Sequence, residues 1–243
     1  MRYKVILSYD GSNYAGFQSQ KNALAIQDVV EGVLKTIYSK DIKIVMSSRT
    51  DAGVHAKYQV FHFDVDDKKD PYKIKFSMNG LLPKDIHVNK VEKVSDSFHA
   101  RYSVKSKTYE YIINNGEYDV FSRNYAFQCF YKLDVDLMKE ASKMFVGTHD
   151  FSSFNTNTYE EYPNQTRTIT EFKITKTKDI IKIRVTASGF LRNQVRLMVG
   201  TLIDLARGKK TMEDVSKMFT NPSKSTRRYN ADPRGLYLVK VRY

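Results

Sequence analysis

Two hydrophobic patterns follow one another along this chain of 243 residues, and each half of the chain contains both. Runs in which every second residue is apolar predict β-strands, whereas apolar residues three or four positions apart predict helices. Strands are expected at residues 3–9, 42–46, 59–65, 86–94, 108–113, 168–176, 180–188 and 236–241. Helices are expected at residues 26–37, 72–82, 135–146, 190–207 and 212–219.

The repeated mixture predicts an α+β fold of two similar α/β halves. Their adjoining strands would share one mostly antiparallel sheet with helices on one face. The two halves are expected at residues 1–105 and 106–243, without a long linker between them. Residues 147–165 are polar and aromatic with little periodicity, and we interpret them as a long loop.

The charge balance indicates a polyanionic partner. Lys and Arg number 40 against 27 Asp and Glu, a formal charge of +13. Such a balance favours nucleic acid, although a generally Lys-rich protein would show it too. The single cysteine, Cys129, excludes an internal disulfide and a Cys-rich metal site. No signal peptide or membrane-spanning stretch is evident, so a cytoplasmic location is expected.

The densest polar cluster, residues 47–56, lies between two expected strands. Asp51-Ala52-Gly53 would suit an ordinary turn. A turn does not require Arg49, Thr50 and His55 as well, and loops between rigid strands often hold catalytic groups. From the chemistry alone, a structural turn and a functional site remain equal alternatives.

Further blocks in the chain, taken with this cluster, resemble one family. RTDAGVHA at 49–56 resembles the signature of the TruA-type tRNA pseudouridine synthases. Blocks in the family's order are YDG at 9–11, YAGFQ at 14–18, FHARYS at 98–103, KTYEY at 107–111, HDFSSF at 149–154, residues 190–200 and GLYL at 235–238. The resemblance covers nearly the whole chain. It implies the pseudouridine synthase fold, with a basic RNA-binding cleft between the halves.

The resemblance also implies roles for single residues. Asp51 corresponds to the catalytic aspartate, Tyr109 to the tyrosine that packs on the target base, and Arg196 to the basic partner of the aspartate. Arg49 corresponds to a residue associated with base flipping, and Leu236 to an apolar residue of the pocket. The implied RNA-contacting residues are Phe98, His99, Ala100, Arg101, Tyr102, Gln165, Thr166, Arg167, Thr168 and Ile169.

The implied reaction is the isomerisation of uridine to pseudouridine at positions 38–40 of the tRNA anticodon stem-loop. Ser48 and Tyr58 stand where the family usually has Gly, and Lys107 where Arg is common. These departures leave ribosomal RNA as an alternative substrate. The family further implies a homodimer, with no DNA or membrane partner.

The chemistry suits these residues. Breaking the glycosidic bond develops positive charge on the sugar, and a carboxylate is the appropriate counter-charge. An arginine nearby favours the ionised carboxylate; Arg196 is the candidate, with Arg192 one helical turn earlier left open. The reaction changes no redox state, so no cofactor is expected, and the five histidines lack metal-ligand spacing.

Several purely structural or rival functional interpretations remain at this point. Tyr109 would share a sheet face with Tyr111, so both could be core residues. The basic residues Arg101, Arg123, Arg167 and those of the stretch 224–228 could be solvated charge or phosphate contacts. A non-catalytic RNA-binding protein is one rival. A glycosidic hydrolase is another, but it normally needs a second acid about 5–10 Å away, for which Glu110 is a candidate.

Overall fold

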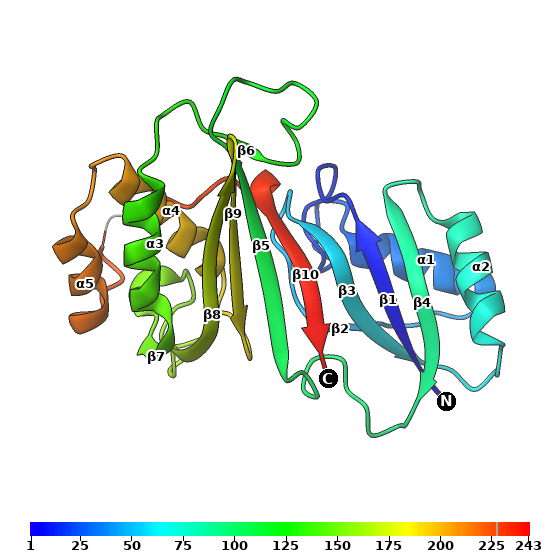
Figure 1. The fold of residues 1–243 in the computed structure, drawn as a ribbon. Coiled ribbons are helices and arrows are strands. Elements are labelled where there is room, and N and C mark those ends of the chain that lie inside the picture. The colour runs from blue at the N-terminus through cyan, green and yellow to red at the C-terminus, as the bar shows by residue number, and fades with distance from the viewer. Residues whose placement is uncertain (227) are drawn as a thin grey trace. The chain divides into compact units, whose positions relative to one another are not determined.

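The computed structural model describes residues 1–226 and 228–243, which form two compact units (Figure 1). Unit 1 comprises Met1–Lys105 and Tyr237–Tyr243, and unit 2 comprises Ser106–Leu236. The sequence-based division assigned all of 106–243 to the second half. That division was wrong for the last strand: Tyr237–Tyr243 belongs to unit 1, where Tyr237 and Leu238 pair in parallel with His55 and Ala56.

Unit 1 is a mixed sheet with two helices. Its strands are β1 (Arg2–Tyr9), β2 (Val45–Met46), β3 (His55–Asp64), β4 (Ile86–Val94) and, apart from its first residue, β10 (Leu236–Arg242). They are ordered β4-β1-β3-β10, and β2 also pairs with β3. Neighbours are antiparallel except β3 and β10.

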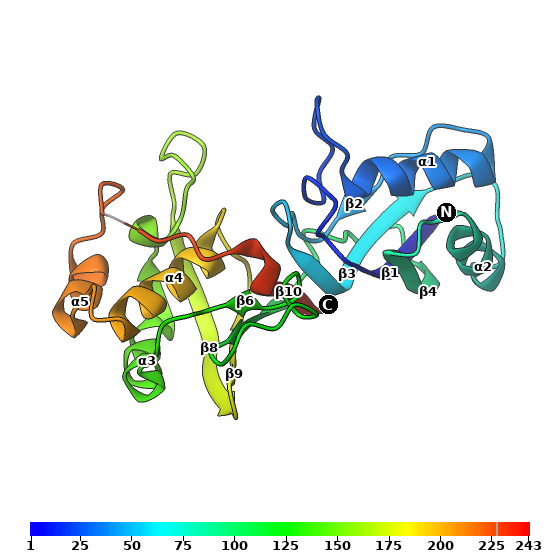
Figure 2. The same cartoon turned by 90° about the horizontal axis from the view of Figure 1, so that it is seen from above.

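The helices of unit 1 are α1 (Ile26–Tyr38) and α2 (Pro71–Leu81), and α1 lies over one face of the sheet (Figure 2). That face is apolar: Tyr3 and Phe63 stack at 5.4 Å, and Tyr38 at the end of α1 meets Phe63 edge-on. The Asp70 side chain caps α2, where Pro71 needs no hydrogen-bond partner for its nitrogen.

Unit 2 is built around four antiparallel strands in the order β5-β9-β8-β7. These are β5 (Ser106–Asn114), β7 (Gly147–Asp150), β8 (Thr166–Thr177) and β9 (Ile180–Ala187); the short β6 (Phe127–Gln128) runs parallel to β5. The predicted α+β class and the mostly antiparallel pairing are therefore confirmed.

The helices of unit 2 are α3 (Val135–Ser142), α4 (Gln194–Ala206) and α5 (Met212–Thr220). Short 3-10 turns cover Lys143–Phe145, Ser152–Phe154 and Pro233–Gly235. The fully buried Phe145 and Phe154 pack together in its core, and the half-buried Phe219 covers them, with ring centroids 4.9–5.2 Å apart. None of the helices in the described chain is both long and apolar enough to span a bilayer.

Two sequence-based assignments need correction. Residues 147–165 are not one loop, because Gly147–Asp150 forms the edge strand β7 and Ser152–Phe154 a 3-10 turn. The helix expected from residue 190 begins only at Gln194. Asn193 adopts a left-handed conformation, with φ of 60°, which interrupts the helix before that point.

Candidate active site

The loop that carries Asp51 connects β2 to β3 in unit 1, and hydrogen bonds fix both of its arms. The buried Ser47 hydroxyl donates to Gln59 Oε1 at 2.8 Å, while Gln59 Nε2 donates to the Ser48 carbonyl, also at 2.8 Å. The Thr50 hydroxyl and the Tyr9 phenol lie 2.7 Å apart in the interior. Asp51 itself is half-buried. Its position therefore rests on a network of directional contacts.

Two glycines let the N-terminal turn press against this loop. A Cβ on Gly11 would lie 2.0 Å from the Val54 carbonyl oxygen, a distance that no side chain tolerates. Gly16 has a φ of +94°, and a Cβ there would lie 2.6 Å from the Thr50 carbonyl. The blocks at 9–11 and 14–18 thus support the backbone on both sides of Asp51.

His55 joins the loop to two other segments. Its Nδ1 accepts the Gly11 N–H at 3.1 Å, and its ring stacks on Tyr237 at 4.7 Å. Asp10 Oδ1 also lies 3.1 Å from Nδ1. The same ring nitrogen therefore meets both the Gly11 backbone and the Asp10 carboxylate, which ties the Asp51 loop to the N-terminal turn. His55 is 2% exposed and supports the loop from within.

Arg49 and Asp51 share this loop but differ in exposure. Arg49 is exposed, and its guanidinium lies 3.4 Å from Gln18 Oε1. The loop therefore presents a long, exposed cationic side chain and a half-buried carboxylate two residues apart. Such an arrangement suits one group that reaches outward to RNA and one that stays at a fixed place.

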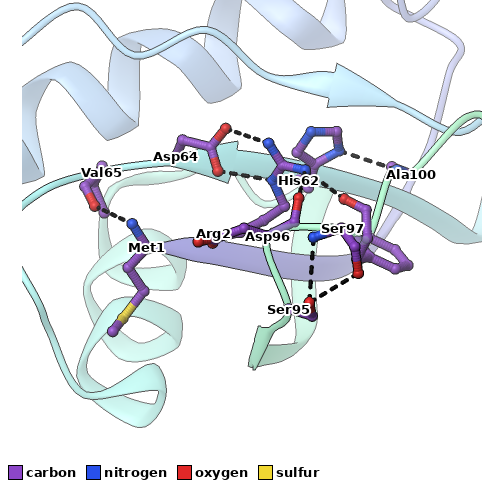
Figure 3. Close-up of polar contacts among 10 residues, drawn as sticks. Met1, Arg2, His62, Asp64, Val65, Ser95, Asp96, Ser97 and Ala100 are labelled. Atoms are coloured by element: carbon purple, nitrogen blue, oxygen red, sulfur yellow. Dashed lines mark hydrogen bonds and ion pairs between the residues drawn. The ribbon is translucent and has the colours of Figure 1, made fainter.

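The segment 98–102 lies at the other end of β3 (Figure 3). The Ala100 N–H donates to His62 Nδ1 at 3.1 Å, and Arg2 binds the Asp96 and Phe98 carbonyls. His62 is seven residues beyond His55 on β3, or about 23 Å at the usual strand rise. The two candidate surfaces of unit 1 are therefore well separated.

Within this segment, only part of the predicted RNA-contacting set faces outward. Ala100 is fully buried, whereas Arg101 and Tyr102 are exposed, Tyr102 at 76%. His99 stacks on Tyr102 at 4.3 Å and accepts the Tyr102 N–H at 3.1 Å. Phe98 and His99 are half-buried. Tyr102 is thus held as an exposed flat ring, which is the form that stacks on a base.

In unit 2, Tyr109 lies on β5 and is 6% exposed. Its ring meets Phe190 edge-on at 5.2 Å. Tyr111, two residues on, is fully buried and donates its phenol to the Asp232 carbonyl at 2.8 Å. The expectation that Tyr109 and Tyr111 share a buried sheet face is confirmed.

Arg196 lies in the first turn of α4 and is fixed against the segment that precedes β10. Its Nε donates to the Ala231 carbonyl at 2.7 Å, and the Ala231 N–H donates back to the Arg196 carbonyl at 3.2 Å. Burial raises the pKa of Asp232, but hydrogen bonds from Arg234 and the charge of Arg196 outweigh it and hold that pKa below its usual value.

Helix α4 lies very close to this segment, and no local sequence pattern predicted that contact. A Cβ on Gly200 would lie 1.7 Å from the Tyr229 carbonyl oxygen, so the helix must carry glycine there. Arg192 is exposed and precedes α4. The expected placement of Arg192 one helical turn before Arg196 was therefore wrong.

Residues 165–169 combine an anchor with a surface. Gln165 is 2% exposed, and its Oε1 accepts from Asn155 Nδ2 at 2.8 Å and from Lys224 Nζ at 2.5 Å. Thr166 and Thr168 are exposed, Arg167 is half-buried, and Ile169 is buried. Burial, followed by the nearby Arg228, lowers the pKa of Lys224. Arg227, within the basic stretch 224–228, lies outside the described residues.

The candidate residues therefore fall into two sets. Unit 1 holds Asp51, Arg49 and the 98–102 segment. Unit 2 holds Tyr109, Arg196, the 165–169 segment and Leu236, which is 5% exposed. The sequence blocks contain Tyr9, His55 and Gly200 but did not show what these residues support, because their partners are distant in the chain. Across the described residues, no three His, Cys, Asp or Glu side chains are grouped as a metal site would require.

Comparison with known proteins identifies the family. A sequence model described as tRNA pseudouridine synthase matches residues 5–103 and 141–243. The chain belongs to this family. It is 43% identical to tRNA pseudouridine synthase A of Exiguobacterium sp. over 242 residues, covering 100% of this chain and 98% of the relative.

Other relatives agree. The chain is 43% identical to tRNA pseudouridine synthase A of Bacillus licheniformis, covering 100% of this chain and 99% of that one. It is 41% identical to the Bacillus subtilis protein of the same name, over 100% and 99%. A chain from the crystal structure of a Cbf5-Nop10-Gar1 complex aligns at 12% identity and a TM-score of 0.35, over 83% and 45%. That alignment is too weak to support any conclusion.

Proposed function

We propose that this protein isomerises uridine to pseudouridine in tRNA, at positions 38–40 of the anticodon stem-loop, in the cytoplasm. The observation that carries the proposal is the similarity to proteins named tRNA pseudouridine synthase A along the full length of both chains. The tightly supported loop around Asp51 agrees with it, because a reacting carboxylate must be held in place before substrate arrives.

In this proposal Asp51 is the catalytic group. The N1–C1′ bond of uridine breaks, the uracil turns, and C5 joins C1′ while the C5 hydrogen leaves to solvent. Positive charge develops on the sugar as the first bond breaks. The carboxylate stabilises that charge, either by attacking C1′ or by removing a proton from C2′.

Residues of unit 2 supply the other roles. Tyr109 packs on the extracted base, since an aromatic face offsets the lost stacking by about 1–3 kcal/mol. Arg196 pairs with Asp51 and keeps it ionised. The bond from its Nε to Ala231 supports this role, because it fixes the plane of the guanidinium. Leu236 lines the pocket, and Arg49 assists extraction of the base.

RNA binding in this proposal relies on the charge of +13 and on the exposed Arg101, Tyr102, Thr166 and Thr168, with Arg167 beside them. Phosphate contacts give affinity that falls as salt rises. We further propose that the protein works as a homodimer.

The test uses transcripts labelled with tritium at uracil C5. We expect tritium release from a tRNA carrying uridine at 38–40, and none when those positions are cytidine. A ribosomal RNA transcript of matched length is the control for substrate class. Tritium release from this transcript alone would identify ribosomal RNA, and not tRNA, as the substrate. Release of free uracil would instead indicate hydrolysis. No release from either RNA would contradict the enzymatic proposal.

A further inference from the structure

The segment that connects α5 to β10 in unit 2 holds the Arg196 side chain. We call residues 223–226 and 228–232 the connecting segment. It runs alongside α4 (Figure 2), and its Ala231 carbonyl accepts the Arg196 Nε–H at 2.7 Å. The Ala231 N–H donates back to the Arg196 carbonyl at 3.2 Å. A guanidinium is planar, so the place of the connecting segment sets the directions in which the other N–H groups of Arg196 point.

One end of the connecting segment is anchored on β5. The fully buried Tyr111 donates its phenol to the Asp232 carbonyl at 2.8 Å. The Asp232 carboxylate accepts the Arg234 N–H at 2.9 Å and so caps the 3-10 turn that leads into β10. This anchor adjoins Ala231 but fixes only one end of the segment. The place of the Ala231 carbonyl therefore also depends on how the other end is held.

The other end is anchored by Lys224 on two buried amides. Its Nζ donates to Asn155 Oδ1 at 2.7 Å and to Gln165 Oε1 at 2.5 Å. Asn155 is fully buried, and its Nδ2 donates to the Phe151 carbonyl and to Gln165 Oε1, so both hydrogens of this amide are used within the protein. We call Lys224, Asn155 and Gln165 the amide hub. A buried network whose members are satisfied in this way holds one geometry.

The amide hub has two further attachments. Arg228 Nη1 donates to the Asn155 carbonyl at 2.6 Å, and its Nη2 donates to the Lys224 carbonyl at 3.0 Å. Asn155 Oδ1 accepts the Asn157 N–H at 2.9 Å, and Asn157 Oδ1 accepts the Arg192 N–H at 2.8 Å. The hub therefore joins the connecting segment to the chain just before α4.

The bonds of Lys224 favour a structural task over contact with RNA. Two of the three N–H donors of its ammonium are used on amide oxygens inside the protein. Its side chain is half-buried, and burial, followed by the charge of Arg228, lowers its pKa. A lysine that binds phosphate offers its ammonium to the ligand as a compact charge. The ammonium of Lys224 is instead directed at the amide hub.

We propose that Lys224 is a positioning residue for the isomerisation, and that it acts on Arg196 through the connecting segment. The inference rests on the role proposed above for Arg196. Without the ammonium, Asn155 Oδ1 and Gln165 Oε1 lose a buried donor, and this end of the connecting segment is released. The Ala231 carbonyl then no longer holds the Arg196 guanidinium in one plane. Because Arg196 serves charge that develops during the reaction, the loss falls on kcat and not on KM.

The kinetic test compares variants of the full chain in the tritium-release assay. Lys224→Met keeps a long side chain but removes the ammonium, and Lys224→Arg keeps a charged donor. Lys182→Met removes an exposed charge from β9 and is the control. We expect Lys224→Met to lower kcat by about 10- to 100-fold, with KM for tRNA within about 2-fold of wild type. Lys224→Arg should recover most of this loss, and Lys182→Met should match wild type. A raised KM at unchanged kcat would overturn the proposal and indicate a phosphate contact.

The nuclear magnetic resonance signal of the Arg196 Nε–H gives a second test that needs neither RNA nor turnover. The protein is labelled with ¹⁵N-arginine, and the signal is assigned by its loss in Arg196→Lys. Because this N–H is bonded to the Ala231 carbonyl, its exchange with solvent should be slow in wild type and in Lys182→Met. In Lys224→Met it should be faster by about 10-fold or more.

Unchanged exchange in Lys224→Met would overturn the proposal, because Lys224 would then support the fold without acting on Arg196. Lys224→Gln serves in both tests if Lys224→Met fails to fold. A wild type that forms no pseudouridine would contradict the proposed function, and the exchange measurement would still decide whether Lys224 positions Arg196.

Discussion

The two units hold their candidate catalytic residues by different means. In unit 1 the Asp51 loop is fixed by directional hydrogen bonds and by the N-terminal turn, whose backbone packs closely on the loop at Gly11 and Gly16. In unit 2 the Tyr109 ring packs edge-on against Phe190, and the Arg196 side chain donates a hydrogen bond to the Ala231 carbonyl of a neighbouring segment. A reacting carboxylate tolerates little displacement, whereas a stacking face tolerates more. Small displacements of the Asp51 loop in unit 1 should therefore reduce turnover sharply, whereas similar displacements of the Tyr109 ring in unit 2 should reduce it only slightly.

The largest effect in unit 2 is expected at Arg196. Arg196→Ala should lower kcat/KM for tritium release by about 100- to 1000-fold, because an electrostatic partner is lost. Arg196→Lys should recover only part of this, since lysine cannot reproduce the bond from Nε to Ala231. Arg192→Ala removes an exposed charge just before α4 and is the control. Equal losses at the two arginines would argue against a specific role for Arg196.

Each unit offers a glycine that tests its backbone contacts. Gly11→Ala and Gly200→Ala should each lower the free energy of unfolding by about 3 kcal/mol, because the added Cβ meets a carbonyl oxygen. Gly32→Ala, in α1 with nothing within 4 Å, should instead stabilise by about 0.5–1 kcal/mol. Urea denaturation measures all three. If Gly11→Ala proved neutral, the turn would not press on the Asp51 loop as described.

His62 makes the stability of unit 1 depend on pH. Burial, with the charge of Arg2, lowers the pKa of His62 to about 4. The unfolded chain takes up a proton near pH 6.5, and the folded protein resists it until about pH 4. Stability from this group is therefore complete above pH 6.5 and is lost as the pH falls toward 4. The expected loss is roughly 2–3 kcal/mol.

Urea denaturation at pH 7 and pH 4.5 checks this dependence. His62→Asn keeps an acceptor for the Ala100 N–H but cannot be protonated in this range. Its stability should fall less than that of wild type between the two pH values. An identical fall in both proteins would assign the pH dependence to other groups.

The smallest effects come from two buried phenols. Tyr9→Phe and Tyr111→Phe each remove one hydrogen bond, to Thr50 and to the Asp232 carbonyl, at a cost of about 1 kcal/mol in the free energy of unfolding. Only Tyr9→Phe should also reduce turnover several-fold, because Thr50 adjoins Asp51. A matching loss of turnover in Tyr111→Phe would remove the contrast between the units.

The sequence revealed elements whose signal is local. The apolar spacing of 26–37 and the alternation of 3–9 correspond to α1 and β1. It missed β7, because an edge strand with the sequence GTHD buries no alternating apolar face. It also placed the last strand in the wrong half. Parallel pairing of β10 with β3 joins residues about 180 apart in the chain, and no local pattern encodes such a contact.

The candidate site was predictable to a similar degree. The signature around Asp51 was visible because its residues are contiguous. Tyr9, Gly11 and His55 lie in the same recognised blocks, but their supporting role was not visible, since they act through contacts with segments more than 40 residues away. Burial of Gln165 and Ala100 was equally hidden.

The most direct measurement compares Asp51→Asn with Asp66→Asn in the tritium-release assay on tRNA. Both changes remove one carboxylate from unit 1, but Asp66 lies in an exposed loop after β3. We predict that Asp51→Asn folds with wild-type stability, binds tRNA and releases no tritium above background, while Asp66→Asn matches wild type. Tritium release by Asp51→Asn at the wild-type rate would contradict the central role of the Asp51 carboxylate.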